Sequence, residues 1–258
     1  MLIMSCFGRT IRGGGELYIL SVWCLLITID IKPPVFRGGL KKEVETMDRL
    51  RLGLYLALIF ILIFTGVTWA EDKEILKEFN TLVERAKNTD DNLDFQALRM
   101  LYTKTPYYSP YGNRFKSREL FDLLRRNEFA QVVEKTTPLL TVEFVNIDLH
   151  YLRMVAFDGL GDREMKAWHE YMTYGLLYSI LDGGDGRTPQ TAFQVISIGE
   201  EYMVLNYLGC QLLRQSLEHI GGHSYDVMEI QSEAGDTVKL YFNVDKPLAW
   251  LSSQFMEE

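Results

Sequence analysis

The chain contains little cysteine. Three of its 258 residues are cysteines, Cys6, Cys24 and Cys210, and the first two lie within the first 46 residues. One cysteine cannot form an internal disulfide. The long part of the chain that carries Cys210 must therefore be stabilised by its apolar core.

Positive charge is also scarce. Lys and Arg number 27 against 35 Asp and Glu, and eight of the basic and five of the acidic residues lie in the first 70 positions. Residues 71–258 thus carry a net charge of about −11 by side-chain count. Such an acidic body repels phosphate backbones, and no basic stripe interrupts it. We expect no nucleic-acid partner.

Signatures of cofactor and metal chemistry are missing as well. The sequence contains no HExxH, CxxC or paired-carboxylate pattern. The Gly-rich segment DGGDGRTP, residues 182–189, lacks the GKS or GKT ending of a phosphate-binding loop, and its acids have the wrong spacing for a calcium loop. We expect a structural turn here, with no cofactor and no metal.

What the chain does have is a leader-like segment at residues 47–70. Two arginines precede an unbroken apolar run from Leu52 to Phe64, and small residues precede a cleavage point between Ala70 and Glu71. This pattern predicts a secreted or periplasmic protein that starts at Met47. Residues 1–46 are then an upstream extension of the reading frame and no part of the fold.

The same segment has an alternative interpretation. If the leader is not cleaved, residues 52–69 are just long enough to span a bilayer and would anchor the protein in the membrane. Membrane contact is expected through this segment alone.

The first half of the mature chain, residues 71–181, has helical periodicity. Apolar residues recur at three- and four-residue spacing in 72–88, in 95–102 and in two further pairs of segments. Asn127 and Gly161 mark the turns of these pairs and lie 34 residues apart, the period of tetratricopeptide repeats. We expect a helical layer with two tetratricopeptide-like hairpins, the second helix of the first hairpin ending before Pro138.

The second half, residues 182–258, predicts a small sheet. Residues 191–197, 225–231 and 237–244 have strand character, while 200–219 has a helical stripe closed by Gly221 and Gly222. The predicted fold is a single α+β domain over residues 71–258. Its sheet has about three mostly antiparallel strands, with a helix between the first and second.

Two histidines are the first candidates for chemistry. In a hairpin that turns near Gly161, His150 and His169 lie level and can face each other. A hydrolase-like or metal-assisted site would need them to converge with Asp185, Glu200 or Glu201. The alternative is that the two imidazoles are satisfied polar residues between helices.

A tyrosine-rich loop is the candidate ligand groove. Residues 103–117 contain Tyr107, Tyr108, Tyr111 and Arg114 among prolines and a glycine that prevent regular structure. These side chains can line a groove for a ligand, or the rings can cap the core.

Several motifs carry a family resemblance. A Gly-Asp-Gly turn leads into Thr-Ala-Phe-Gln-Val-Ile-Ser at 191–197, followed by Glu-Glu-Tyr at 200–202 and Phe-Asn-Val at 242–244. Over about residues 75–245 the chain resembles the bacterial domain of unknown function 4919. The resemblance implies a bacterial envelope or secreted protein and brings no assigned activity.

The sequence therefore favours a non-catalytic binding or interaction module of the cell envelope. Its partner, a protein or a small molecule, is not identified by any motif. The alternative is the hydrolase-like or metal-assisted enzyme built on His150 and His169.

Overall fold

Side-chain caps set the start of four of the helices. The computed structural model describes residues 72–111, 114–231 and 235–255. In four helices a capping oxygen accepts a hydrogen bond from the backbone N–H three residues on, as expected for Asp, Asn and Ser at this position. The caps are Asp94 for α3 (Phe95–Tyr102), Asn146 for α6 (Ile147–Leu160), Asp162 for α7 (Arg163–Leu181) and Ser197 for α8 (Ile198–Tyr207).

The leader lies outside the described residues. This applies to residues 1–46, to the segment 47–70 with its cut between Ala70 and Glu71, and to the alternative span 52–69. Among the helices that the structure does describe, none combines the length and the apolar composition needed to cross a bilayer.

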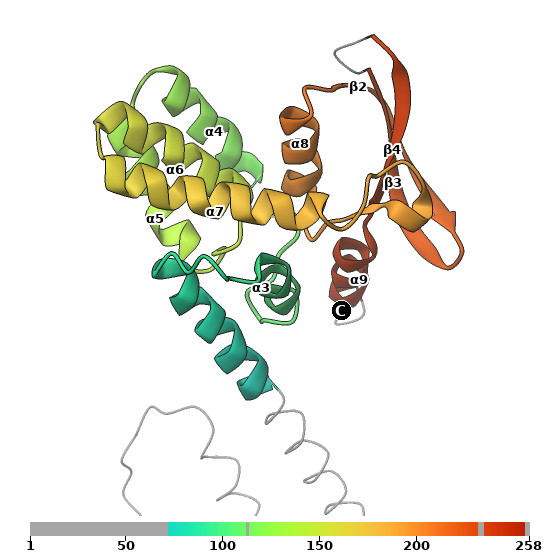
Figure 1. Ribbon diagram of the computed structural model, residues 1–258, viewed down its shortest axis with the longest axis horizontal. Coiled ribbons are helices and arrows are strands. Elements are labelled where there is room, and N and C mark those ends of the chain that lie inside the picture. Colours follow the sequence, from blue (N-terminus) through green and yellow to red (C-terminus); the bar gives the residue numbers. More distant parts are fainter. Residues whose placement is uncertain (1–71, 112–113, 232–234, 256–258) are drawn as a thin grey trace, which may run out of the picture. The chain divides into compact units, whose positions relative to one another are not determined.

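The helical half is arranged as the periodicity predicts. A helix at residues 72–87 precedes α3, and α4 (Arg114–Arg125) with α5 (Phe129–Leu140) forms the first hairpin. The second hairpin is α6 with α7 (Figure 1). Asn127 and Gly161 both have positive φ, 59° and 76°, at the two turns. The tetratricopeptide likeness of these hairpins stays a prediction.

One helix end was predicted wrongly. α5 passes through Pro138 and ends at Leu140. Proline removes one backbone N–H from the hydrogen-bond ladder of the helix. Because Pro138 lies close to the end of α5, the loss of this hydrogen bond does not prevent the last turn from forming.

The sheet has four strands, one more than predicted. They are β1 (Phe193–Gln194), β2 (Gln211–Ile220), β3 (His223–Gln231) and β4 (Thr237–Asn243), in the order β1-β4-β3-β2. The pairs β2–β3 and β3–β4 are antiparallel, and β1 is parallel to β4. The mostly antiparallel sheet and the helix between the first two strands are as predicted.

The extra strand comes from the segment predicted as one long helix, residues 200–219. The helix α8 ends at Tyr207, and Gly209 follows with a φ of 63°, the left-handed conformation that ends many helices. The chain then runs as β2, and Gly221 and Gly222, with φ of 61° and 86°, form the turn of the β2–β3 hairpin. The two glycines therefore close a hairpin and not a helix.

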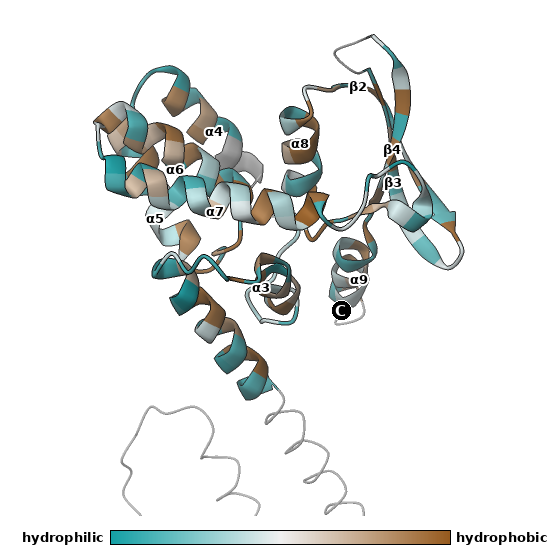
Figure 2. Ribbon diagram, viewed as in Figure 1, coloured by the Kyte–Doolittle hydropathy of each residue, from teal (hydrophilic) through white to brown (hydrophobic). Residues whose placement is uncertain are grey.

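One apolar core runs from the helical half into the sheet. It contains Phe79 and Leu98 from the first helices, Met172 and Leu176 from α7, and Met228, Leu240 and Phe242 from the strands. A second cluster fills the space among α4, α5 and α6, with Leu120, Val132 and Leu152 at its centre. Figure 2 shows hydrophobic residues on α8 and along the strands. The final helix α9 (Asp245–Gln254) packs against β3.

Candidate functional site

The two candidate histidines face each other across the α6–α7 hairpin, as the spacing predicted. His150 Nδ1 lies 3.0 Å from His169 Nδ1, and both side chains are fully buried. His150 Nε2 lies 2.8 Å from the carbonyl oxygen of Phe144. Arg153 Nε donates to His169 Nε2 at 2.8 Å.

These contacts fix one proton arrangement. His150 must carry its proton on Nε2, because only then can it donate to the Phe144 carbonyl. His150 Nδ1 is then an acceptor, so His169 carries its proton on Nδ1 and accepts from Arg153 on Nε2. Every ring nitrogen is used, and both imidazoles are neutral.

The electrostatics agree with neutral rings. Burial lowers the pKa of His150 to about 4, with the Phe144 carbonyl opposing the shift and the Arg153 charge adding to it. Burial, with the neighbouring His150 and Arg153, lowers the pKa of His169 to about 2. Adding a proton to His150 Nδ1 would place its N–H against the N–H of His169 Nδ1, so that two hydrogen-bond donors would face each other.

Arg153 connects this network to α5 and was not found from the sequence. Its Nη1 donates to the Val133 carbonyl and to the hydroxyls of Thr136 and Thr137 at 2.9 to 3.0 Å. Its guanidinium carbon also lies 5.1 Å from the centre of the Phe157 ring. The arginine shares the α6 surface of His150 at a three-residue spacing, which is the one signal that could have pointed to it.

Glu200 belongs to a second buried network. Its two carboxylate oxygens accept from Arg99 Nε at 2.8 Å and Arg99 Nη2 at 2.6 Å, and each side chain is 1% exposed. Arg99 also donates to the Gln194 carbonyl and to Ser179 Oγ. Glu200 accepts from the backbone N–H of Ile196 at 2.8 Å. The pair thus joins α3, α7, β1 and α8.

Two further acids, Glu201 of α8 and Asp148 of α6, lie near Glu200. Glu201 is fully buried there. Asp148, in the first turn of α6, has its pKa raised to about 6 by burial and by the charge of Glu200. A Cβ on Gly199 would come within 2.6 Å of Asp148 Oδ2, so the two helix starts are in direct contact. Among the described residues no group of three His, Cys, Asp or Glu side chains is placed to hold a metal.

Asp185 takes part in neither network. Its Oδ1 accepts from the backbone N–H of Arg187 at 3.0 Å and from Thr191 Oγ1 at 2.5 Å, within the Gly-rich turn. Those hydrogen bonds lower the pKa of Asp185. A Cβ on Gly184 would lie 2.2 Å from the Thr191 carbonyl oxygen, so this turn needs a glycine for close backbone approach.

The tyrosine loop places its rings in different surroundings. Tyr108 is buried and donates to the Ile196 carbonyl at 2.8 Å, while Tyr107 is 49% exposed. Tyr111 lies against Trp250 with ring centres 5.9 Å apart. Arg114 begins α4, and its side chain lies outside what the structure describes. Tyr108 behaves as a ring that caps the core.

Exposed tyrosines gather instead on α7 and α8. The rings of Tyr174 and Tyr178 are stacked at 5.9 Å, and Tyr178 meets Tyr207 edge-on at 6.0 Å. All three are at least 36% exposed, and Leu208 beside them is 39% exposed. We call these four residues the tyrosine surface. The four-residue spacing of Tyr174 and Tyr178, off the apolar stripe of α7, is the signal in the sequence that predicts such a pair.

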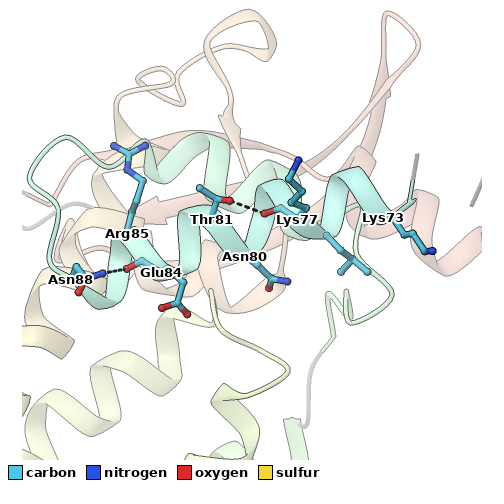
Figure 3. Close-up of a pocket in the computed structure, with 8 residues that line it drawn as sticks. Lys73, Lys77, Asn80, Thr81, Glu84, Arg85 and Asn88 are labelled. Atoms are coloured by element: carbon cyan, nitrogen blue, oxygen red, sulfur yellow. Dashed lines mark hydrogen bonds between the residues drawn. The ribbon is translucent and has the colours of Figure 1, made fainter. Parts of the chain in front are cut away.

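A hollow along the helix at 72–87 has a different character. Figure 3 shows its lining side chains, which come from residues 73–88 and include Lys73, Lys77, Glu84 and Arg85. Lys77 is paired with Glu74 and Lys87 with Glu84, all at exposed positions. This is an open, mixed-charge helix face.

Comparison with known proteins gives one match. A family model described as "Domain of unknown function (DUF4919)" matches residues 70–252. The chain belongs to the DUF4919 family. No curated protein and no solved structure matches it. The DUF4919 match covers both buried networks and the tyrosine surface.

The histidine network predicts a pH dependence of stability in this DUF4919 protein. Both folded-state pKa values lie below the ordinary value of 6.5, so between pH 6.5 and about 4 the unfolded chain binds protons that the folded chain does not. We expect the two histidines to remove about 2 to 4 kcal/mol of unfolding free energy between pH 7 and pH 5. Denaturant unfolding at each pH measures this.

A matched pair of variants isolates the effect. The raised pKa of Asp148 increases the unfolding free energy as the pH falls, the opposite of the histidine effect, and this contribution is the same in both variants. His169→Gln should show a shallower loss of stability with falling pH than His219→Gln, because His219 is exposed and contacts only Ser224 among the hydrogen-bonding groups described. Equal slopes in the two variants would contradict the neutral network.

The Arg99–Glu200 pair predicts a large, non-additive effect on stability. Glu200→Gln leaves the buried Arg99 charge without its counter-charge, and we expect a loss of about 3 to 5 kcal/mol of unfolding free energy. Arg99→Met combined with Glu200→Leu should cost less than the sum of the two single changes, since neither charge then remains. Glu134→Gln, at an exposed position of α5, serves as the control. A loss below about 1 kcal/mol for Glu200→Gln, the size of a surface pair, would refute the role of this pair.

Proposed function

We propose that this DUF4919 protein is an exported, non-catalytic module that binds a protein partner in the bacterial envelope through its tyrosine surface. The observation that carries the proposal is the contact among Tyr174, Tyr178 and Tyr207, three solvent-exposed rings from two helices. Isolated exposed aromatics are ordinary, whereas a contiguous group is typical of an interaction site.

The chemistry of the tyrosine surface suits a protein partner. Tyrosine supplies a large apolar ring at low entropic cost and a hydroxyl that stays hydrogen-bonded at an interface, and it is enriched among residues that dominate binding energy. The hydrogen bond to the Tyr207 side chain raises the pKa of Tyr178, so the Tyr178 ring stays neutral and protonated near neutral pH. A neutral surface on an acidic protein also avoids charge repulsion with the partner.

The interior supports binding in preference to catalysis. His150 and His169 use every ring nitrogen within the fold, and Glu200 is held by Arg99 and by a backbone N–H. A metal or a substrate would have to displace those hydrogen bonds. Asp185, one of the three acids that the hydrolase-like alternative could use, has its carboxylate engaged in its own turn.

Site-specific photo-crosslinking in living cells tests the proposal. A photoreactive amino acid at Tyr178 should give one defined protein adduct, and the adduct should disappear when Tyr174 and Tyr207 are both changed to Ser. The same photoreactive group at Glu134 on α5 is the matched control and should give no such adduct. The adduct should begin at Glu71, since export removes the leader.

Two outcomes would overturn the proposal. The absence of a Tyr178 adduct, or an adduct of equal yield from position 134, would remove the tyrosine surface as the binding site. An adduct whose chain continues past Ala70 toward the N-terminus would remove the cleaved leader and support the anchored form.

A further inference from the structure

The strand β2 is a long sheet edge. It has ten residues and ends the order β1-β4-β3-β2, so no described strand lies beyond it. None of its residues is buried, and Leu213 and Leu217 are 50% and 51% exposed. An exposed edge of this length offers a row of backbone N–H and C=O groups to another strand.

The β2–β3 hairpin defines which backbone groups face that edge. Ile220 pairs with His223 across the two-residue Gly turn, which in such hairpins is the first hydrogen-bonded pair. Hydrogen-bonded and non-hydrogen-bonded pairs alternate along an antiparallel ladder. The backbone groups of Gln215, Leu217 and His219 therefore point away from β3, toward the free edge.

The side chains of β2 are complementary to a reversed copy of the same strand. When two β2 strands lie antiparallel with their Ser216 residues opposite each other, Gln215 of each copy pairs with Leu217 of the other, so outward-facing backbone groups meet. In this register Arg214 of each copy lies opposite Glu218 of the other, and the pair occurs twice. Opposite charges placed directly across antiparallel strands are favourable, and like charges are unfavourable. A shift by two residues places Arg214 opposite Ser216 or Ile220 and loses both ion pairs.

Arg214 is an unusual charge in this part of the chain. It is the one Lys or Arg between Arg187 and Lys239, it is exposed, and it forms no ion pair with any residue that the structure describes. Arg214 and Glu218 pair with Glu229 and Tyr225 of β3, two residues on one face of the sheet, so both lie on that face. The geometry points to a second copy of this chain as the occupant of the edge: we propose that two molecules join their sheets by antiparallel β2–β2 pairing centred on Ser216.

A neighbouring helix enlarges this interface. Tyr202 of α8 is 40% exposed, and its hydroxyl lies 3.4 Å from Gln215 Oε1. Leu217 of the second copy would lie across from Gln215 and next to this ring. The bulge between Leu212 and Arg214 limits regular pairing to residues 214–220, the part that contains both charges. This surface is separate from the Tyr178 contact, so dimerisation and partner binding can fail independently.

Sedimentation of the full chain over a range of concentrations tests the pairing. We expect a dimer in the wild type, and a dissociation constant raised at least about tenfold, roughly 1.4 kcal/mol, in Arg214→Glu and in Glu218→Arg. The double variant Arg214→Glu with Glu218→Arg restores the opposite charges across the twofold and should recover the dimer. Gln215→Pro removes an outward-facing N–H without removing a β3 hydrogen bond, and should give a folded monomer by circular dichroism.

Other results would overturn the inference. A wild type that stays monomeric at about 100 µM, where weak specific dimers still associate, excludes the pairing. A dimer that is equally stable in both single charge variants and in Gln215→Pro places the contact on another surface.

Discussion

The buried ion pair between Arg99 and Glu200 is the constraint on which the arrangement of this protein depends. Arg99 belongs to α3 and Glu200 to the first turn of α8, 101 positions apart in the chain. Their side chains also contact α7 through Ser179 and β1 through the Gln194 carbonyl. The peptide of Ile196 connects them further, because its N–H donates to Glu200 and its carbonyl accepts from Tyr108. The pair thereby links the helical half to the sheet, and the two halves also share one apolar core.

The same physical requirement accounts for the way in which Glu200, His150 and His169 are partnered inside the fold. A buried charge must be paired and hydrogen-bonded, because otherwise the free energy of removing it from water exceeds the stability of a small fold. Glu200 meets that requirement with a two-point contact to an arginine. The histidines of α6 and α7 meet it differently, by staying neutral in a chain of hydrogen bonds that ends on Arg153. The two surfaces that we propose for partner binding and for pairing of copies, the tyrosine surface and the free edge of β2, both lie outside these buried networks.

Much of the fold follows from local sequence signals, and the errors have identifiable causes. Helix periodicity placed both hairpins, and alternation in 237–244 placed β4, since each pattern reports which face is buried. The helix predicted after Tyr207 was wrong because Leu208, Leu212 and Leu217 fit a helical stripe. The feature that ends the helix is a single glycine with positive φ at position 209. Edge strands with neither face buried lack alternation, so β2 had no periodic signal of its own.

The candidate site was predictable where it depended on one hairpin and not where it depended on distant segments. Counting residues from the Gly161 turn brought His150 and His169 together correctly. No local rule links Arg99 to Glu200, because their contact arises only when α3 packs beside α8. Arg153 and the ring contact of Tyr178 with Tyr207 were missed for the same reason, as each joins different helices.

Native-state hydrogen exchange tests most directly the claim that the Arg99–Glu200 pair couples the two halves. We expect the slowest amides of α3, α7 and β3 to exchange with one common free energy, the global unfolding value, and to separate into two groups in Glu200→Gln. Two groups already present in the wild type, with the sheet opening independently of the helices, would contradict it.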